Sequence, residues 1–435
     1  MKISIIGTGY VGLVSGVCFA EFGFDVTCVD KDENKIKALK QGEVPIYEPG
    51  LETILKRNTK SNRLSFTSDL GKAVKNSDIV FIAVGTPSRR GDGHADLSFV
   101  YGVSEEISRS IDGYTLVVTK STVPVGTGKK VKEIIKKNNP KALFDIASNP
   151  EFLREGSAIE DFMRPDRVVV GLETERAKKI MATLYRPLFL LETPIIFTSL
   201  ESSELIKYAS NAFLAVKISY INQMSDLCES VGANIDDIAK GMGLDKRIGN
   251  KFLHSGPGYG GSCFPKDTLA LVKTAKDNKI SVSLVEETVR YNKHRKLGMV
   301  KKIQQVSKKI KNKNIAILGL SFKPETDDMR ESPAIEIING LLKLNANIYA
   351  YDPVAMPEAK KIFDDKINFS KSSQNCLKDK DILVIITEWN EFRALDPNKI
   401  FKLMKGNVVI DFRNIFDPHI MKENKFKYYC LGGRS

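Results

Sequence analysis

A glycine-rich turn directly after the first apolar run most strongly limits how this chain folds. Ile3-Ser4-Ile5-Ile6 has the pattern of a strand, and Gly7-Thr8-Gly9-Tyr10-Val11-Gly12 then leads into a helical pattern. In such a turn the first glycine allows the tight bend, the second lets backbone approach a diphosphate, and the third allows close packing of helix on strand. The N–H groups at the helix start then bind the phosphates. The pattern predicts a βαβ unit that binds a dinucleotide; the alternative is a glycine-rich turn without a ligand.

An acidic residue after the second predicted strand indicates which dinucleotide is bound. Asp30 follows Val26-Thr27-Cys28-Val29 and lies 18 residues after Gly12. A carboxylate at this point bonds the ribose hydroxyls and repels a 2′-phosphate, so NAD is favoured over NADP. We therefore expect NAD to be held by Gly7, Gly9, Tyr10, Val11, Gly12 and Asp30. For Tyr10, an ordinary packing role is the alternative.

Apolar runs typical of buried parallel strands recur in both halves of the chain. They cover residues 3–6, 26–29, 79–84, 116–118 and 167–170, and then 314–319, 348–352, 382–386 and 408–411. Helical patterns separate these runs, which is typical of doubly wound α/β domains. We predict two Rossmann-like parallel-sheet domains, over residues 1–200 and 301–435. The second lacks the full glycine fingerprint, because Leu320-Ser321-Phe322-Lys323 follows Gly319.

The segment between these domains, residues 201–300, has no strand pattern and is predicted to be helical. Apolar residues recur three or four apart, which indicates one long amphipathic helix; they are Leu205, Ala209, Ala212, Val216, Tyr220, Met224 and Leu227. Such a helix is a candidate dimerisation axis, so we expect a homodimer or a higher homo-oligomer. Lys207 and Asn211 share a face offset from this stripe. That face is either solvated or able to bind an oxyanion during hydride transfer.

A second glycine-rich run carries a candidate nucleophile. Gly256-Pro257-Gly258-Tyr259-Gly260-Gly261 leads directly into Ser262-Cys263-Phe264-Pro265-Lys266. Pro265 predicts a helix start, where free N–H groups and the helix dipole favour thiolate over thiol. Cys263 is therefore placed like a nucleophile, a small buried hydrophobe being the alternative. Asp267, about one turn further on, either orients a base or water or compensates the helix dipole.

Composition limits the possible partners. The chain has 435 residues and a net charge of +13, which fits either a polyanion binder or a lysine-rich surface. No cluster of Lys and Arg interleaved with aromatics occurs, so we expect no nucleic-acid partner. None of the six cysteines lies in a Cys-x-x-Cys pair and the four histidines lack ligand spacing, so we expect a reducing cytoplasm and no metal. No apolar run approaches the roughly 18 residues of a membrane span.

Several further motifs, taken together, resemble the UDP-glucose/GDP-mannose dehydrogenase family, and within it the branch that oxidises UDP-glucose. The matches run almost from end to end of the chain. They are residues 7–12, Val84-Gly85-Thr86-Pro87, Lys120-Ser121-Thr122-Val123-Pro124, residues 148–156 (SNPEFLREG), residues 164–168 (RPDRV), residues 207–213 (KYASNAF), residues 260–267 (GGSCFPKD), Phe322-Lys323 and Arg330-Glu331-Ser332-Pro333.

The resemblance implies a role for each matching residue. Cys263 would be the nucleophile, Lys207 and Asn211 would stabilise oxyanions, and Thr122, Glu151 and Asp267 would position water or move protons. NAD would be held by Asp30, Lys35, Thr86, Thr122, Glu155, Lys266 and Arg330. The sugar nucleotide would be held by Glu151, Phe152, Leu153, Arg154, Glu155, Lys207, Asn211, Arg247, Phe252, Leu253, Gly260, Lys323 and Arg413, with Arg247 reaching across a dimer.

The activity implied by the resemblance is the four-electron oxidation of UDP-glucose to UDP-glucuronate with two NAD per turnover. A thiohemiacetal on Cys263 holds the aldehyde between the two oxidations, and a thioester forms before hydrolysis. A sister dehydrogenase acting on GDP-mannose or a UDP-N-acetylhexosamine is the alternative within the family. An NAD-dependent epimerase is disfavoured because the chain has no Tyr-x-x-x-Lys. A non-catalytic redox sensor that uses Cys263 is the third hypothesis.

Overall fold

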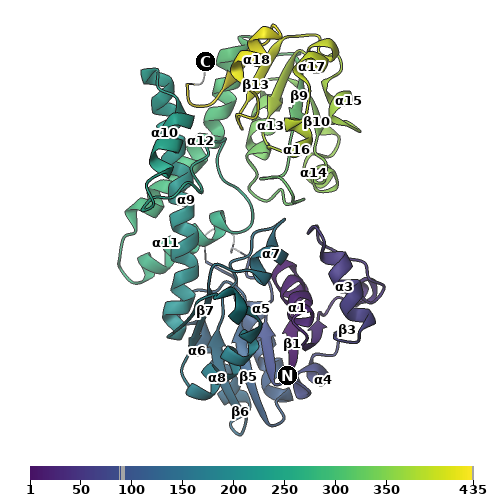
Figure 1. Cartoon of the computed structure of the whole chain (residues 1–435), viewed down its shortest axis with the longest axis vertical. Helices are drawn as coiled ribbons and strands as arrows, with labels where there is room; N and C mark the ends of the chain where they lie inside the picture. Colours follow the sequence, from purple (N-terminus) through teal and green to yellow (C-terminus); the bar gives the residue numbers. More distant parts are fainter. Residues whose placement is uncertain (88, 90–93, 434–435) are drawn as a thin grey trace. The chain divides into compact units, whose positions relative to one another are not determined.

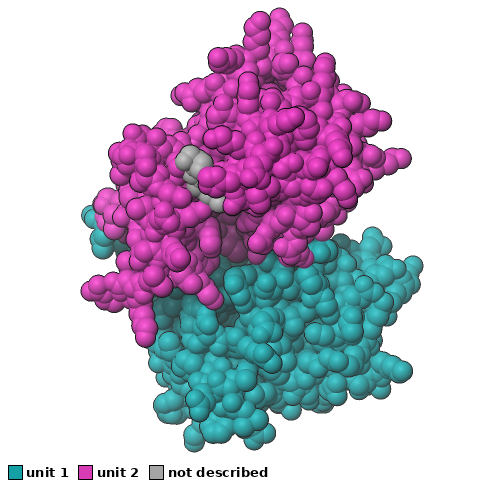
Figure 2. Space-filling model, turned by 45° about the horizontal axis from the view of Figure 1, so that its top comes forward, with its two compact units in different colours: residues 1–210, 273–280 teal, residues 211–272, 281–435 magenta. Residues whose placement is uncertain are grey.

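The computed structural model describes residues 1–87, 89 and 94–433 and divides into two compact units. Unit 1 comprises Met1–Ser210 and Lys273–Ile280, and unit 2 comprises Asn211–Val272 and Ser281–Ser435 (Figure 2). The predicted division into three domains at residues 200 and 300 is a different partition and stays a prediction. Within the described residues, every helix is too short or too polar to traverse a lipid bilayer.

Unit 1 is built on a sheet with the strand order β3-β2-β1-β4-β5-β6-β7-β8. The strands are β1 (Lys2–Ile6), β2 (Asp25–Val29), β3 (Leu64–Thr67), β4 (Ile79–Ile82), β5 (Tyr114–Thr119), β6 (Leu143–Ser148), β7 (Val168–Leu172) and β8 (Ile195–Thr198). Neighbouring strands are parallel from β3 to β6, as predicted for a doubly wound fold. The expectation of a parallel sheet is wrong at β7, which pairs antiparallel with β6. The segment between them contains only a short helix and stays at the carboxyl edge of the sheet, so β7 returns in the opposite direction.

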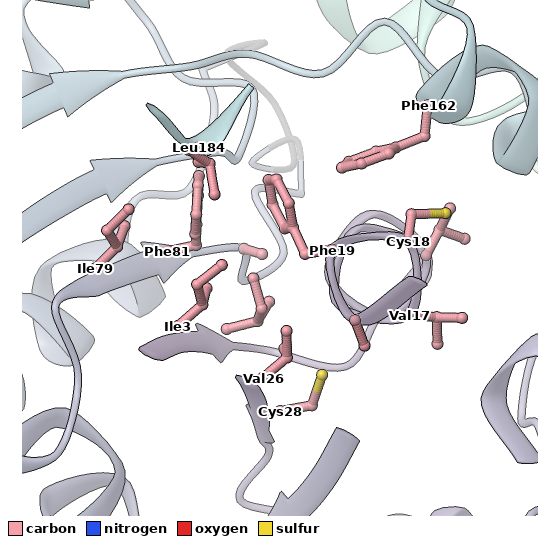
Figure 3. Packing of buried hydrophobic residues seen from close by; sticks show 14 of the residues in the cluster. Ile3, Val17, Cys18, Phe19, Val26, Cys28, Ile79, Phe81, Phe162 and Leu184 are labelled. Atoms are coloured by element: carbon pink, nitrogen blue, oxygen red, sulfur yellow. The ribbon is translucent and has the colours of Figure 1, made fainter. Parts of the chain in front are cut away.

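Helices surround this sheet: α1 (Tyr10–Glu21), α2 (Glu33–Lys40), α3 (Leu51–Lys60), α4 (Leu70–Lys75), α5 (Ser98–Ser110), α6 (Thr127–Asn138), α7 (Ala158–Met163), α8 (Glu175–Leu184) and the 3₁₀ helix η1 (Arg186–Leu191). Helix α1 packs against β1, β2 and α3 (Figure 1). At the centre of the core, the Phe19 ring lies 5.2 Å from that of Phe81 and 4.9 Å from that of Phe162 (Figure 3). These three rings join α1, β4 and α7, and they fix the carboxyl-terminal ends of α1 and α7 relative to the sheet.

The long helix predicted from the apolar repeat is α9 (Leu200–Val231), but its buried face is not the predicted one. We name Leu205, Phe213, Tyr220, Leu227 and Val231 the α9 stripe; these five side chains are between 43% and 66% exposed. Lys207 and Asn211, on the opposite face, are only 3% and 7% exposed. The interpretation of that face as solvated is therefore wrong. Periodicity ranks apolar positions as buried, whereas here the polar residues are buried through specific partners.

Unit 2 contains a second sheet with the order β11-β10-β9-β12-β13-β14, all parallel. Its strands are β9 (Asn314–Leu318), β10 (Asn347–Tyr351), β11 (Asn368–Phe369), β12 (Ile382–Ile385), β13 (Val408–Asp411) and β14 (Lys427–Cys430). This order matches β3 to β6 of unit 1, which confirms the prediction of two Rossmann-like domains. Helix α13 packs against α12 and β10, and α15 against β9 and β10 (Figure 1).

The helices assigned wholly or mainly to unit 2 are α10 (Ile235–Gly243), α11 (Phe264–Asp277), α12 (Ser283–Ser307), α13 (Pro333–Lys343), α14 (Met356–Phe363), η2 (Asp364–Lys366), α15 (Ser373–Leu377), α16 (Asn390–Arg393), α17 (Pro397–Leu403) and α18 (Pro418–Glu423). Helix α11 begins at the predicted position, one residue after Cys263.

Candidate active site

The predicted phosphate loop has the geometry that its glycines were expected to provide. A Cβ on Gly7 would lie 2.6 Å from Ala83 O, and one on Gly12 would lie 1.9 Å from Gly7 O. Gly9, in contrast, has nothing within 4 Å of such a Cβ. Helix α1 starts with Gly9 as its N-cap and without a capping side chain, so its first N–H groups and the open space at Gly9 suit a diphosphate.

Asp30 follows β2 and is held beside the phosphate loop. Its carboxylate accepts hydrogen bonds from Thr8 N at 3.0 Å, Thr8 Oγ1 at 2.6 Å and Lys35 Nζ at 3.2 Å. Burial opposes ionisation, but these hydrogen bonds outweigh it and lower the pKa of Asp30 below its ordinary value. Asp30 is thus a fixed anion, which fits ribose recognition. Two further predicted cofactor residues, Thr86 and Thr122, follow the neighbouring strands β4 and β5. They are in contact, because Thr86 Oγ1 donates a hydrogen bond to Thr122 O at 2.9 Å.

A buried ion pair follows β6. Lys207 Nζ lies 3.1 Å from Glu151 Oε1, and the two side chains are 4% and 5% exposed. Glu151 Oε2 also accepts from Leu153 N at 2.5 Å. The Phe152 ring lies 5.2 Å from Lys207 Nζ. Taking such a pair out of water is costly, and only close, well-oriented contacts offset that cost. The pair therefore holds the Lys207 ammonium group in one position, where it can stabilise a developing negative charge.

Lys120 is a further buried cation that motif reasoning did not single out as a site residue. Its Nζ donates to Asn149 Oδ1 at 3.1 Å, and Tyr185 OH donates to the same oxygen at 2.5 Å. Burial lowers the pKa of Lys120 to about 8, an effect that the Glu151 carboxylate opposes and the Lys207 ammonium reinforces. Lysine in the run after β5 was visible in the sequence, but nothing there indicated its burial. It lines, with Glu151 and Phe152, one small cavity of unit 1.

In unit 2, the candidate nucleophile stands directly before α11. Cys263 is half-buried and in no disulfide, its Sγ lies 3.5 Å from Ser262 Oγ, and its carbonyl accepts from Asp267 N at 2.8 Å. Asp267 is 1% exposed and accepts from Asn211 Nδ2 at 2.6 Å and Lys266 Nζ at 2.7 Å. Asp267 is thus bound to side chains that resemblance assigned to the site. Mere compensation of the helix dipole does not require them.

The glycine-rich run before Cys263 is held by buried polar side chains of α9 and α12. Asn222 Oδ1 accepts from Gly256 N at 2.8 Å, and Arg295 Nε donates to Gly256 O at 3.0 Å. Asn292 bonds both backbone groups of Tyr259, at 2.8 and 3.1 Å. Gly260 packs so closely on Glu331 that a Cβ would lie 2.4 Å from its carbonyl oxygen. These contacts hold the backbone of the run in one position, and they therefore also fix the position of Cys263, which follows it. Sequence reasoning did not find Asn222, Asn292 or Arg295.

Four further predicted site residues of unit 2 are Phe252, Leu253, Lys323 and Arg413. Arg413 donates from Nε to Ile386 O at 2.7 Å and pairs with Glu388 at 3.0 Å. Its NH1 would lie 2.9 Å from a Cβ on Gly256, so it reaches the glycine-rich run. Leu253 is buried, and Phe252 lies 6.1 Å from the Phe264 ring. Lys323 lies after β9, with its Nζ 5.8 Å from the Phe322 ring.

Three arginines that resemblance assigned to the site are engaged with acidic neighbours. Arg330 pairs with Asp328 at 2.8 Å and Arg154 with Asp161 at 2.6 Å, and both guanidinium side chains are more than half exposed. Arg247 has a side chain that is 90% exposed and pairs with Asp245 at 2.6 Å. Glu155 is half-buried beside Gly156 in unit 1.

The second sheet does not repeat the open carboxylate of the first. Asp352 follows β10 as Asp30 follows β2, but it is fully buried. Its two oxygens accept from Leu320 N, Ser321 N, Ser321 Oγ, Trp389 Nε1, Val354 N and Ala355 N at 2.8–3.1 Å. The carboxylate is saturated by protein donors, so this half does not bind a ribose in the manner of the first. In the described part of the chain, no His, Cys, Asp and Glu side chains are grouped so as to hold a metal ion.

A sheet whose first turn accepts a dinucleotide, in a chain that also holds a thiol at a helix start, defines the class of dinucleotide-dependent dehydrogenases. Models of the UDP-glucose/GDP-mannose dehydrogenase family match the chain in three parts: the NAD binding domain over residues 1–189, the central domain over 201–294 and the UDP binding domain over 316–418. The chain belongs to this family. The resemblance seen in the motifs and the expectation of NAD as cofactor are confirmed.

Individual relatives cover the chain almost completely. It is 56% identical over 435 residues to the UDP-glucose 6-dehydrogenase of Rhizobium meliloti, an alignment that covers 99% of each chain. Among solved structures, a UDP-glucose dehydrogenase from Pyrobaculum islandicum matches with a TM-score of 0.92 at 37% identity, covering 100% of this chain and 98% of that one. A UDP-D-ManNAc dehydrogenase from Pyrococcus horikoshii matches with a TM-score of 0.86 at 26% identity, covering 100% and 99%.

Proposed function

We propose that this chain oxidises UDP-glucose to UDP-glucuronate, with two NAD consumed per sugar nucleotide. The observation that carries the proposal is Cys263 at the start of α11, with buried Asp267 bonded to Asn211 one turn away. The relative of 56% identity, which is named a UDP-glucose 6-dehydrogenase, supports the choice of substrate. A sister activity on a UDP-N-acetylhexosamine is less favoured, because the UDP-D-ManNAc dehydrogenase is only 26% identical.

Each step of the proposed reaction relies on a different side chain. Bound NAD accepts one hydride in each oxidation. Lys207, held by Glu151, stabilises the alkoxide from which the first hydride leaves, and the alcohol proton passes to a carboxylate or water. The Cys263 thiolate then adds to the aldehyde carbon, forming a C–S bond and an oxyanion. Loss of the second hydride gives a thioester, which water positioned by Glu151, Thr122 or Asp267 cleaves to the acid and free thiol.

We propose that NAD is held by the phosphate loop, Asp30, Lys35, Thr86, Thr122, Glu155, Lys266 and Arg330. The sugar nucleotide is held by residues 151–155, Lys207, Asn211, Phe252, Leu253, Gly260, Lys323 and Arg413. Phosphate recognition needs cations, and Lys323 and Arg413 follow β9 and β13, at the carboxyl edge where sheets of this type bind ligands.

We infer that the protein is a homo-oligomer that works in the cytoplasm. The α9 stripe exposes five large apolar side chains on one helix face, and a second copy of this chain would cover them. Arg247, whose side chain is 90% exposed, would then be available to a neighbouring copy. The six cysteines form no disulfide, which fits a reducing compartment.

The proposed reaction is tested by product stoichiometry. With UDP-glucose, the wild-type protein should form two NADH per molecule consumed, and Cys263→Ser should lose at least about 10³-fold in UDP-glucuronate formation, because no adduct can hold the aldehyde. Cys430→Ser is the matched control, since Cys430 is also half-buried. Normal acid formation by Cys263→Ser, or one NADH per sugar nucleotide in the wild type, would refute the assignment.

A further inference from the structure

A buried glutamate outside every motif used so far joins the two ligand-binding loops of unit 1. Glu48 lies between α2 and α3 and is 7% exposed. Its Oε2 accepts from Tyr10 OH and from Gly156 N, the latter at 2.7 Å. Its Oε1 accepts from Ala158 N at 2.8 Å. A carboxylate with this many donors is held in one position and fixes the segments that supply them.

One of these donors belongs to the phosphate loop. Tyr10 is the first residue of α1, between Gly9 and Gly12 of the glycine fingerprint. Its hydroxyl group donates to Glu48 and accepts from Gly156 N at 2.9 Å. Burial, together with the Glu48 carboxylate, raises the pKa of Tyr10 well above its ordinary value. Tyr10 therefore remains a proton donor throughout the working pH range, and its side chain is committed to a contact within the protein.

The other donors belong to the end of the proposed sugar loop. Gly156 directly follows Glu155 and has φ +81°, and Ala158 begins α7. The start of this loop is held by the bond from Leu153 N to Glu151, and its middle by the pair of Arg154 with Asp161. Glu48 holds the end, and the loop meets Tyr10 both through Glu48 and through the bond from Gly156 N to the Tyr10 hydroxyl.

We propose that Glu48 is a positioning residue, which with Tyr10 sets the distance between the loop that binds the cofactor diphosphate and the loop that binds the sugar. Hydride transfer needs donor and acceptor carbons in a narrow range of separation, and a misplacement of about 1 Å can cost ~10²-fold in rate. Both loops lie in unit 1, so a bridge between them acts directly on that separation. The inference rests on the proposed role of residues 151–155.

The test uses Tyr10→Phe and Glu48→Gln in the full-length protein. Tyr10→Phe keeps the ring and leaves Glu48 bonded to Gly156 and Ala158. Tyr114→Phe is the matched control, because Tyr114 OH also donates to a carboxylate of unit 1, Asp145 Oδ2 at 2.7 Å. We expect Tyr10→Phe to lower kcat about 3- to 30-fold, and to raise the isotope effect with C6-deuterated substrate, at a melting temperature like that of Tyr114→Phe.

The double variant distinguishes a bridge from two separate effects. Because both substitutions disrupt the same cluster of Tyr10, Glu48 and Gly156, the loss of kcat in Tyr10→Phe/Glu48→Gln should not exceed that of the worse single variant. Losses that multiply, or a Tyr10→Phe variant with the kcat and isotope effect of Tyr114→Phe, would overturn the proposal. The assay uses whichever sugar nucleotide the wild type oxidises, so failure with UDP-glucose counts against the proposed substrate and leaves the result on Glu48 readable.

Discussion

Buried charges distinguish the site at the scale of single residues. Lys207, Glu151, Asp267 and Lys120 are all at most 5% exposed, although burying a charge is costly unless it is paired and hydrogen-bonded. Burial lowers the pKa of Lys120, and its hydrogen-bond partners Asn149 and Tyr185 are neutral. The cost of keeping this ammonium group charged should therefore be visible in the pH dependence of stability.

Replacing Lys120 by Met should remove that pH dependence. Burial lowers the pKa of Lys120 to about 8 in the folded protein, against roughly 10.4 in the unfolded chain. Between these values the unfolded chain binds more protons, so stability rises with pH relative to a chain without the lysine. The melting temperature of the wild type should rise relative to that of Lys120→Met between pH 8 and pH 10, by a free-energy difference of at most about 3 kcal/mol.

Thermal unfolding of the two proteins in parallel across this pH range is the measurement. Lys132→Met is a suitable control, since Lys132 is a partly exposed lysine of α6 that pairs with Glu173. A melting-temperature difference between wild type and Lys120→Met that stays constant with pH would show that Lys120 titrates normally.

At the scale of elements, α9 is fixed to the sheet one turn before Lys207. Ser203 Oγ donates to Ser148 O at 3.0 Å, at the end of β6. Glu204 is 2% exposed and accepts from Gly126 N at 2.6 Å and Gly128 N at 2.7 Å, at the start of α6. These contacts tie α9 to the segments that follow β5 and β6, which carry Thr122 and Glu151, so they set where Lys207 points.

Glu204→Ala should therefore destabilise unit 1 and disturb the site together. The substitution removes the acceptor of two N–H groups, those of the half-buried N-cap Gly126 and of the buried Gly128, and a buried group left unsatisfied costs about 1–3 kcal/mol. Glu201→Ala is the control on the same turn, because Glu201 forms a surface pair with Lys129 of little value. A lower melting temperature and a kcat reduced at least about tenfold in Glu204→Ala, with Glu201→Ala near wild type, is the expected outcome; equal effects of the two would contradict it.

How far the elements were predictable depends on which physical signal each carries. The runs that became β4 and β12, IVFI and ILVI, are continuously apolar because both faces of the sheet are covered. Strands β3, β6 and β8 have mixed or short patterns, LSFT, LFDIAS and IIFT, and their pairing comes from tertiary contacts. The site residues were found through motifs and resemblance, whereas the burial of Lys207 and the roles of Lys120, Glu48 and Asn292 depend on partners more than 30 positions away or on other elements.

The α9 stripe belongs to the scale of the whole molecule. Its five apolar side chains run along most of a 32-residue helix. They form a continuous stripe, whereas ordinary exposed apolar residues are scattered singly over a protein surface. Covering it with the same face of a second copy gives an isologous contact, the commonest arrangement of homo-oligomers.

Charges placed on the stripe should split the proposed homo-oligomer. Light scattering should give the wild type at least twice the 48.4 kDa of one chain, and Phe213→Glu/Leu227→Glu should approach 48.4 kDa. Ile420→Glu introduces a charge at another exposed apolar residue, 48% exposed on α18, and should leave the mass unchanged. A monomeric wild type, or a double variant of unchanged mass, would contradict the interpretation of the stripe.

The second sheet has the same strand order as β3 to β6 of the first, so NAD could in principle bind to either of them. The six protein donors around Asp352 prevent NAD from binding to the second sheet in this way, since they leave no lone pair of the carboxylate to accept a hydrogen bond from a ribose hydroxyl. Calorimetric titration should accordingly saturate at one NAD per chain even at high coenzyme concentration. The second sheet is therefore available to a different nucleotide, so NAD and the sugar nucleotide need not compete for one binding site.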